Sequence, residues 1–193
     1  MVNDPASKSP ASADSASDAP APRGAASGEP ASPPCYAHEA DDAYMGYASQ
    51  AEILTDLNEL LEAERAGAFV AMASFHLAGA DERYVQLMHE VRAGESRWCA
   101  MLSSQIERLG GTPSLATGAF REKVLAIPDP LDRLALLNRG QGWVVRKLNQ
   151  LCPRIRDSEL HDALAEMRDA HVEMIAFANT LLPEDRRPQK SPA

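Results

Sequence analysis

Four long segments of the chain repeat their apolar residues every three to four positions, and none alternates apolar and polar residues as a strand does. Ser49, with Glu52 three residues later, predicts a capping box at the start of the first segment. This periodicity predicts an all-α fold. The predicted helices cover residues 49–77, 81–109, 130–151 and 158–182.

The connection over 111–129 is longer than the turns that join the other predicted helices, and it has room for one short helix near 120–126. Two helix hairpins joined by one longer link predict an antiparallel four-helix bundle. The length of the link leaves two topologies open. Either the four helices run up-down-up-down, or the link crosses the whole length of the bundle.

Residues 1–48 differ sharply from the rest of the chain. More than half of them are Ala, Pro or Ser, and Val2 is their only Val, Ile, Leu or Phe. Such a segment cannot bury enough apolar surface to offset the entropy of ordering it, so we expect a disordered tail. The polar residues 184–193 predict a short C-terminal tail, which leaves 49–183 as one domain of ordinary size.

The formal net charge of −9 disfavours binding to nucleic acid or to an anionic membrane, because both carry negative charge. No apolar run reaches the roughly 18 residues of a membrane span, and the first residues do not resemble a secretory signal. Cys35, Cys99 and Cys152 are widely spaced, so they predict neither a disulfide framework nor a cysteine-based zinc site. We therefore expect a cytoplasmic protein.

Each predicted helix carries one polar residue in the middle of its apolar stripe: Glu64, Glu95, Gln141 and His171. An ionisable side chain at such a position is costly to bury unless it is paired or bound to metal. Helix bundles build their sites from inward side chains on facing helices. These four residues are therefore the candidates for a common site.

This layout resembles the ferritin-like superfamily of carboxylate-bridged di-iron bundles. In that pattern two helices supply one Glu each and the other two supply Glu-x-x-His. Glu64, Glu95 and His171 match three of the six ligand positions. The resemblance implies a ferritin-like bundle with an incomplete ligand set. The other three positions carry Trp98, Gln141 and Arg168.

Five stretches are also similar to an uncharacterised bacterial family of ferritin-like domains. The likeness covers nearly all of 50–180, and it supports the fold with no established activity to carry over. The stretches are ERAGA (64–68), ESRWCAML (95–102), GGTPS (110–114), TGAF (117–120) and NRGQGWVVRKL (138–148).

Two interpretations of the polar layer remain open. Two carboxylates and an imidazole suit non-haem iron or manganese, so Glu64, Glu95 and His171 are candidate ligands of a metal-dependent oxidase or oxygenase. Gln141 would then lie behind the ligands. Alternatively, Arg168 reaches the carboxylates one turn from His171 and balances their charge without metal. That arrangement indicates a binding or structural module, and whether the chain is an enzyme stays open.

The residues around this layer are candidates for a binding pocket. Trp98 and Trp143 either pack in the core or line the pocket, and Cys99 is either a buried inert thiol or a ligand. Gly140 and Gly142 flank Gln141 inside a helix, which costs about 2 kcal/mol relative to alanine. Close packing against Trp98 or approach to a ligand would offset that cost.

Arg139, beside these glycines, suggests a third function, a small-molecule or anion sensor. The chain has no nucleophile elbow, phosphate-binding loop, GxGxxG or HExxH, so the common hydrolase, kinase and dehydrogenase classes lack support. Long helices with apolar residues on more than one face predict a homodimer. We also expect the tail over 1–48 to reach a protein partner.

Overall fold

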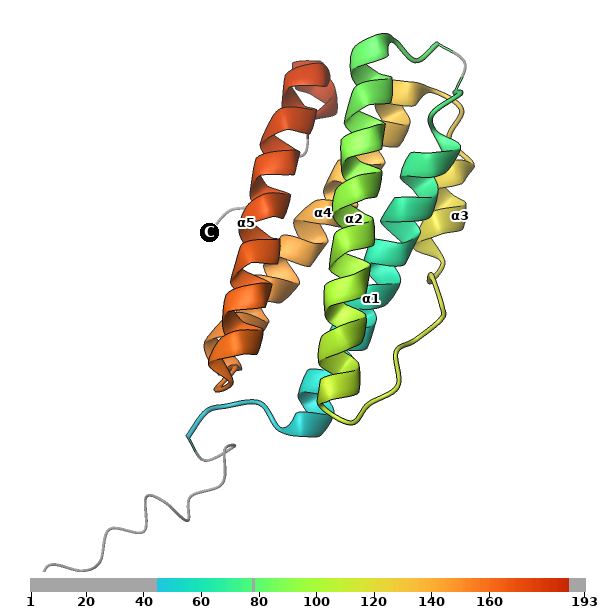
Figure 1. Cartoon of the computed structure of the whole chain (residues 1–193). Helices are drawn as coiled ribbons and strands as arrows, with labels where there is room; N and C mark the ends of the chain where they lie inside the picture. The colour runs from blue at the N-terminus through green and yellow to red at the C-terminus, as the bar shows by residue number, and fades with distance from the viewer. Residues whose placement is uncertain (1–44, 78, 188–193) are drawn as a thin grey trace, which may run out of the picture. The chain divides into compact units, whose positions relative to one another are not determined.

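The computed structural model describes residues 45–77 and 79–187, and every regular element within them is a helix. The all-α prediction is therefore confirmed (Figure 1). Two short 3₁₀ segments, η2 (Cys152–Arg154) and η3 (Glu184–Arg186), follow the last two long helices. The helices are α1 (Gln50–Ala73), α2 (Glu82–Arg108), the short α3 (Phe120–Leu125), α4 (Pro130–Leu151) and α5 (Ser158–Leu181).

Side chains cap the N-termini of all four long helices. The predicted capping box is present: Ser49 Oγ accepts from the Glu52 N–H at 3.3 Å, and the Ser49 N–H donates to Glu52 Oε2 at 2.9 Å. Such caps satisfy N–H groups that have no partner inside the helix. At the other three helices the cap is an aspartate: Asp81, Asp129 and Asp157.

The long connection crosses the bundle from one end to the other. Early in it, the Ser114 N–H donates to Asn58 Oδ1 at 2.7 Å, near the start of α1. Later, the guanidinium of Arg121 lies 4.5 Å from the ring centre of Phe69, near the end of α1. The connection therefore runs along α1. As a result, helix α4 runs in the same direction as helix α2 (Figure 1). One long crossover is the ferritin-like arrangement.

Two apolar clusters fill the bundle, one towards each end. Each cluster takes residues from all four long helices, as the predicted stripes require. Between them lies a layer of buried polar side chains. Residues typical of the first cluster are Leu57, Leu102, Leu148 and Leu164, and those of the second are Val70, Leu87, Leu134 and Ala178.

The predicted boundaries need small changes. Helix α1 ends at Ala73 instead of residue 77. The next residue, Ser74, is buried, and its hydroxyl group donates to Val70 O at 2.7 Å. Phe177 continues the spacing of the apolar residues in the last helix and would be expected to point inward, but it is 37% exposed, and Ala178 is buried instead.

The predicted tails fall mostly on residues 1–44 and 188–193, which lie outside the described residues. Ala48 is already buried, and its N–H donates to Arg154 O at 2.9 Å. None of the helices in the described part of the chain is long and apolar enough to cross a membrane.

Candidate metal centre

The four polar stripe residues meet in one buried layer between the apolar clusters. Each comes from a different helix, and each is at most 5% exposed: Glu64 on α1, Glu95 on α2, Gln141 on α4 and His171 on α5. The inward position of each follows from the period of its helix.

Three of these side chains face one another closely enough to share an ion. One ligand atom from each of Glu64, Glu95 and His171 lies within 4.8 Å of the other two. His171 Nε2 lies 3.3 Å from Glu64 Oε1. Gln141 lies beside them, and its Nε2 donates to Glu95 Oε1 at 3.3 Å.

The hydrogen bond on the other side of the His171 ring decides what the ring presents to the carboxylates. Nδ1 lies 2.9 Å from the backbone oxygen of Met167, which can only accept. Nδ1 therefore carries a proton, and in the neutral ring Nε2 offers its lone pair towards Glu64. This is the tautomer that a histidine ligand uses.

Burial perturbs both carboxyl groups. Loss of hydration raises the pKa of Glu64 from 4.5 to about 7. The pKa of Glu95 is raised well above its ordinary value, first by burial and then by the charge of Glu64 nearby. Neither oxygen of Glu64 has a hydrogen-bond partner among the described residues. No arginine, lysine or backbone N–H of the described residues therefore pairs with Glu64, although the Glu95 carboxyl group and the His171 ring lie close enough to share a proton with it.

Arg168 does not supply that charge. Its Nε donates to Asp169 Oδ1 at 2.8 Å, and about a third of its side chain is exposed. The prediction that Arg168 joins a buried Glu/Arg/His cluster is therefore wrong. Arg168 precedes His171 by three residues, which is close to one helical turn. Its side chain nevertheless turns towards solvent, where its charge stays hydrated.

Gly67 makes room for the carboxylate of Glu95, and the sequence analysis did not single it out. A Cβ atom at Gly67 would lie 2.6 Å from Glu95 Oε1, far inside van der Waals contact. Gly67 follows Glu64 by three residues, so both lie on the inner face of α1. This spacing from Glu64 is the only feature of the sequence that indicates a role for Gly67 in the polar layer.

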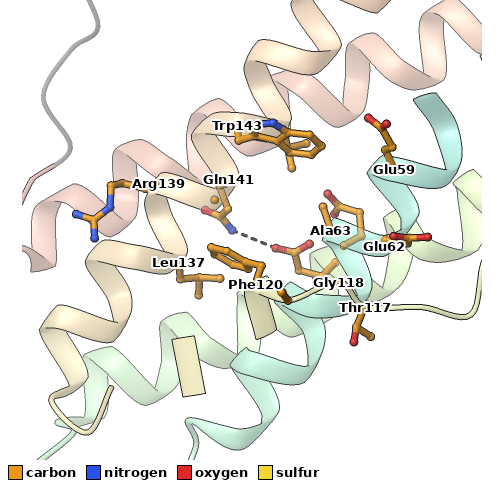
Figure 2. Close-up of a pocket in the computed structure, with 16 residues that line it drawn as sticks. Glu59, Glu62, Ala63, Thr117, Gly118, Phe120, Leu137, Arg139, Gln141 and Trp143 are labelled. Atoms are coloured by element: carbon orange, nitrogen blue, oxygen red, sulfur yellow. Dashed lines mark hydrogen bonds between the residues drawn. The ribbon is translucent and has the colours of Figure 1, made fainter. Parts of the chain in front are cut away.

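A cavity of about 480 Å³ leads to this layer between α1, the crossover connection and α4. Its apolar wall includes Phe120, Leu137 and Trp143, and its floor includes Glu95 and Gln141. Figure 2 shows the rings of Trp143 and Phe120 on opposite sides of Gln141, whose hydrogen bond is dashed. The volume falls within the range of small-molecule sites.

A smaller cavity of about 100 Å³ reaches the layer from the opposite side, between α2 and α5. Its lining includes Glu95, Trp98, Gln141 and His171. Trp98 belongs at the same time to the first apolar cluster, so it packs in the core and also borders the layer. The guanidinium of Arg97 covers its ring, 4.5 Å from the ring centre.

The other pocket candidates lie in different surroundings. Trp143 is 39% exposed and lines the larger cavity with Gln141. Arg139 also borders this cavity, but it is exposed and its guanidinium extends away from Gln141 in Figure 2. Cys99 lines neither cavity, and burial raises the pKa of its thiol to about 12, which leaves it protonated.

The two helical glycines differ in their contacts. A Cβ atom at Gly140 would lie 2.5 Å from Phe120 Cζ, whereas one at Gly142 would meet only the end of Arg146, at 3.6 Å. The predicted close packing is thus present at Gly140, but its partner is Phe120 and not Trp98. Phe120 lies on the crossover connection, where helix periodicity gave no signal for it.

The donor set fits a single metal ion better than a pair. Two carboxylates and a neutral imidazole suit iron or manganese. Two ligands on opposite sides of such an ion are about 4 Å apart, so small side-chain rotations would bring the three residues into range. Gln141, Trp98 and Arg168 add no carboxylate or imidazole that could hold a second ion.

A family model described as Domain of unknown function (DUF6306) matches residues 51–180. Among curated proteins, none matches this chain. A solved structure from Anabaena variabilis ATCC 29413, a two-domain protein containing DJ-1/ThiJ/PfpI-like and ferritin-like domains, is similar at 17% identity and a TM-score of 0.47. The match covers 86% of this chain, which spans about half the length of that protein.

Proposed function

The chain belongs to the family described as Domain of unknown function (DUF6306), and from that premise we propose that it is a binding module for a single divalent metal ion. Glu64, Glu95 and His171 would hold the ion, and Gln141 would orient Glu95 through its hydrogen bond. Iron or manganese is the expected metal.

One observation carries the proposal: the carboxylate of Glu64 is fully buried, and no backbone, amide or guanidinium N–H of the described residues donates to it. An isolated buried carboxylate is unstable unless a cation or a proton neutralises it. The alternative, a structural charge cluster, needed Arg168, and Arg168 pairs with Asp169 instead. The lone pair on His171 Nε2, 3.3 Å from Glu64 Oε1, is available to a metal ion placed between them.

A bound iron or manganese ion with open coordination positions would supply Lewis acidity and redox chemistry. An oxidase or oxygenase role would also need access for a substrate, and the larger cavity supports this second candidate. The sensor hypothesis receives less support, because Arg139 is exposed and Phe120 covers Gly140.

The test is elemental analysis of untagged protein after growth in medium supplemented with iron and manganese. We expect close to one metal ion per chain in the wild type and a near-complete loss in Glu64→Gln, which keeps the shape of the side chain. Glu62→Gln is the matched control, because Glu62 lines the cavity but binds Ser114 at 2.6 Å instead of facing the layer. Equal metal content in all three proteins, or none in the wild type, would refute the proposal.

We place the protein in the cytoplasm as part of the same proposal. Cys99 and Cys152, the two described cysteines, are both free, which suits a reducing compartment. The homodimer and a partner for the tail over 1–48 remain predictions.

A further inference from the structure

We infer that the larger cavity binds a small organic amine with a flat apolar body, its ammonium group directed towards Glu95 and Glu64. This binding function goes beyond the metal proposal. The ammonium group and the metal ion would use the same two carboxylates and would compete for them, so the amine is tested on metal-free protein. Three properties of the cavity support it: its walls, its charge and its floor.

The walls favour a flat apolar body. Phe120 and Trp143 border the cavity together with aliphatic side chains such as Leu137 and Val144. Trp143 stays 39% exposed, although a tryptophan usually finds cover in a folded protein. A ligand lying against its indole would bury that surface and stack on it.

The charge around the cavity favours a cation over an anion. Four glutamates line it: Glu59, Glu62, Glu64 and Glu95. Arg139 is the one basic residue of the lining, and its guanidinium extends away from Gln141 (Figure 2). Lys147 binds Glu59 Oε2 at 2.6 Å from outside the lining, so it neutralises only the rim.

The floor favours a hydrogen-bond donor. Gln141 donates one N–H to Glu95, and the oxygens of Glu64 behind it accept no hydrogen bond from the described residues. An ammonium group carries three donors and a positive charge, so it would satisfy these acceptors. The aromatic rings on either side would add cation–π attraction, as in sites for organic cations.

The experiment is calorimetric titration of metal-free protein with 2-phenylethylamine. The comparison ligands are 2-phenylethanol, which has the same body without charge, and 3-phenylpropanoate, which carries the opposite charge. We expect the amine to bind, the alcohol to bind at least tenfold more weakly, and the carboxylate to show no binding. Trp143→Ala should weaken amine binding roughly tenfold.

Phe177→Ala is the matched control, because it removes an aromatic ring of similar exposure, 37%, that lines neither cavity. It should leave amine binding unchanged, and melting curves should show that both variants fold. Equal binding of amine and alcohol, no binding of the amine, or equal affinity in Trp143→Ala and wild type would overturn the inference. Because no metal is present, this result is independent of the metal content that tests the proposed function.

Discussion

At the scale of single residues, the polar layer depends on the absence of a side chain at Gly67. Gly67 leaves the space that the carboxylate of Glu95 fills, and a Cβ atom there would lie 2.6 Å from Glu95 Oε1. Gly94, on α2, has no atom within 4 Å of the place where its Cβ would be. Both glycines lie inside helices, but a side chain has space at Gly94 and none at Gly67.

We predict opposite effects of alanine at these two positions. Gly67→Ala should displace Glu95, reduce metal content and destabilise the protein by about 1–3 kcal/mol, as overpacking does. Gly94→Ala should keep the metal and stabilise the protein by up to about 1 kcal/mol, through higher helix propensity. Urea denaturation and elemental analysis of both variants test this. A stabilising Gly67→Ala substitution that keeps its metal would contradict the close approach.

At the scale of elements, the crossover connection forms one wall of the larger cavity. Phe120 begins α3 and packs onto the backbone of α4 at Gly140. Arg133, also on α4, holds the end of this connection, because its guanidinium donates to Leu125 O at 3.1 Å and to Ile127 O at 2.6 Å. The cavity wall is therefore fixed to α4 at two places.

The glycine pair of α4 provides the element-scale prediction. Gly140→Ala should push Phe120 off α4 and destabilise the protein by about 1–3 kcal/mol. Gly142→Ala should stabilise it by about 0.5–1 kcal/mol, because the new methyl group meets only the flexible end of Arg146. Chemical denaturation measures both effects, and limited proteolysis of 111–129 reports whether the connection loosens. Equal stabilisation by the two substitutions would show that Phe120 does not constrain this helix.

At the scale of the whole molecule, the buried carboxyl groups couple stability to pH. The pKa of Glu64 is about 7 in the folded chain and 4.5 as its ordinary value. The folded state therefore binds the carboxyl proton of Glu64 more tightly than the unfolded state does. The stability that this proton contributes is lost as the pH rises from about 4.5 through about 7. The raised pKa of Glu95 acts in the same direction.

We predict that metal-free protein loses on the order of 3 kcal/mol of stability between pH 5 and pH 8. Glu64→Gln should reduce this dependence and leave the part that the raised pKa of Glu95 causes, whereas Glu62→Gln should keep all of it. Urea denaturation at fixed temperature with a chelator present gives the curve. The exposed capping residue Glu52, whose pKa a hydrogen bond from the Ser49 backbone lowers to about 2, titrates below this range. Stability that rises across the range in metal-free wild type would contradict the prediction.

Much of the molecule follows from the sequence alone. The helix period placed Glu64, Glu95, Gln141 and His171 on inward faces, and Pro130 and Ser158 start their helices where predicted. These features are local: a helix needs only its own period, caps and breakers to define its buried face. The lengths of the links also predicted two helix hairpins, but they left two topologies open.

The tertiary structure alone decided the rest. The path of the crossover, the contact of Phe120 with Gly140 and the space above Gly67 for Glu95 all join residues far apart in the sequence, where no periodic signal exists. Arg168 is a residue whose position in the sequence did not determine where its side chain lies. Its spacing from His171 allowed an inward side chain, but hydration and the neighbouring Asp169 hold its charge near solvent. The layer thus holds two buried carboxylates and no arginine, because the helix period fixes which face a residue lies on but not where a long side chain ends.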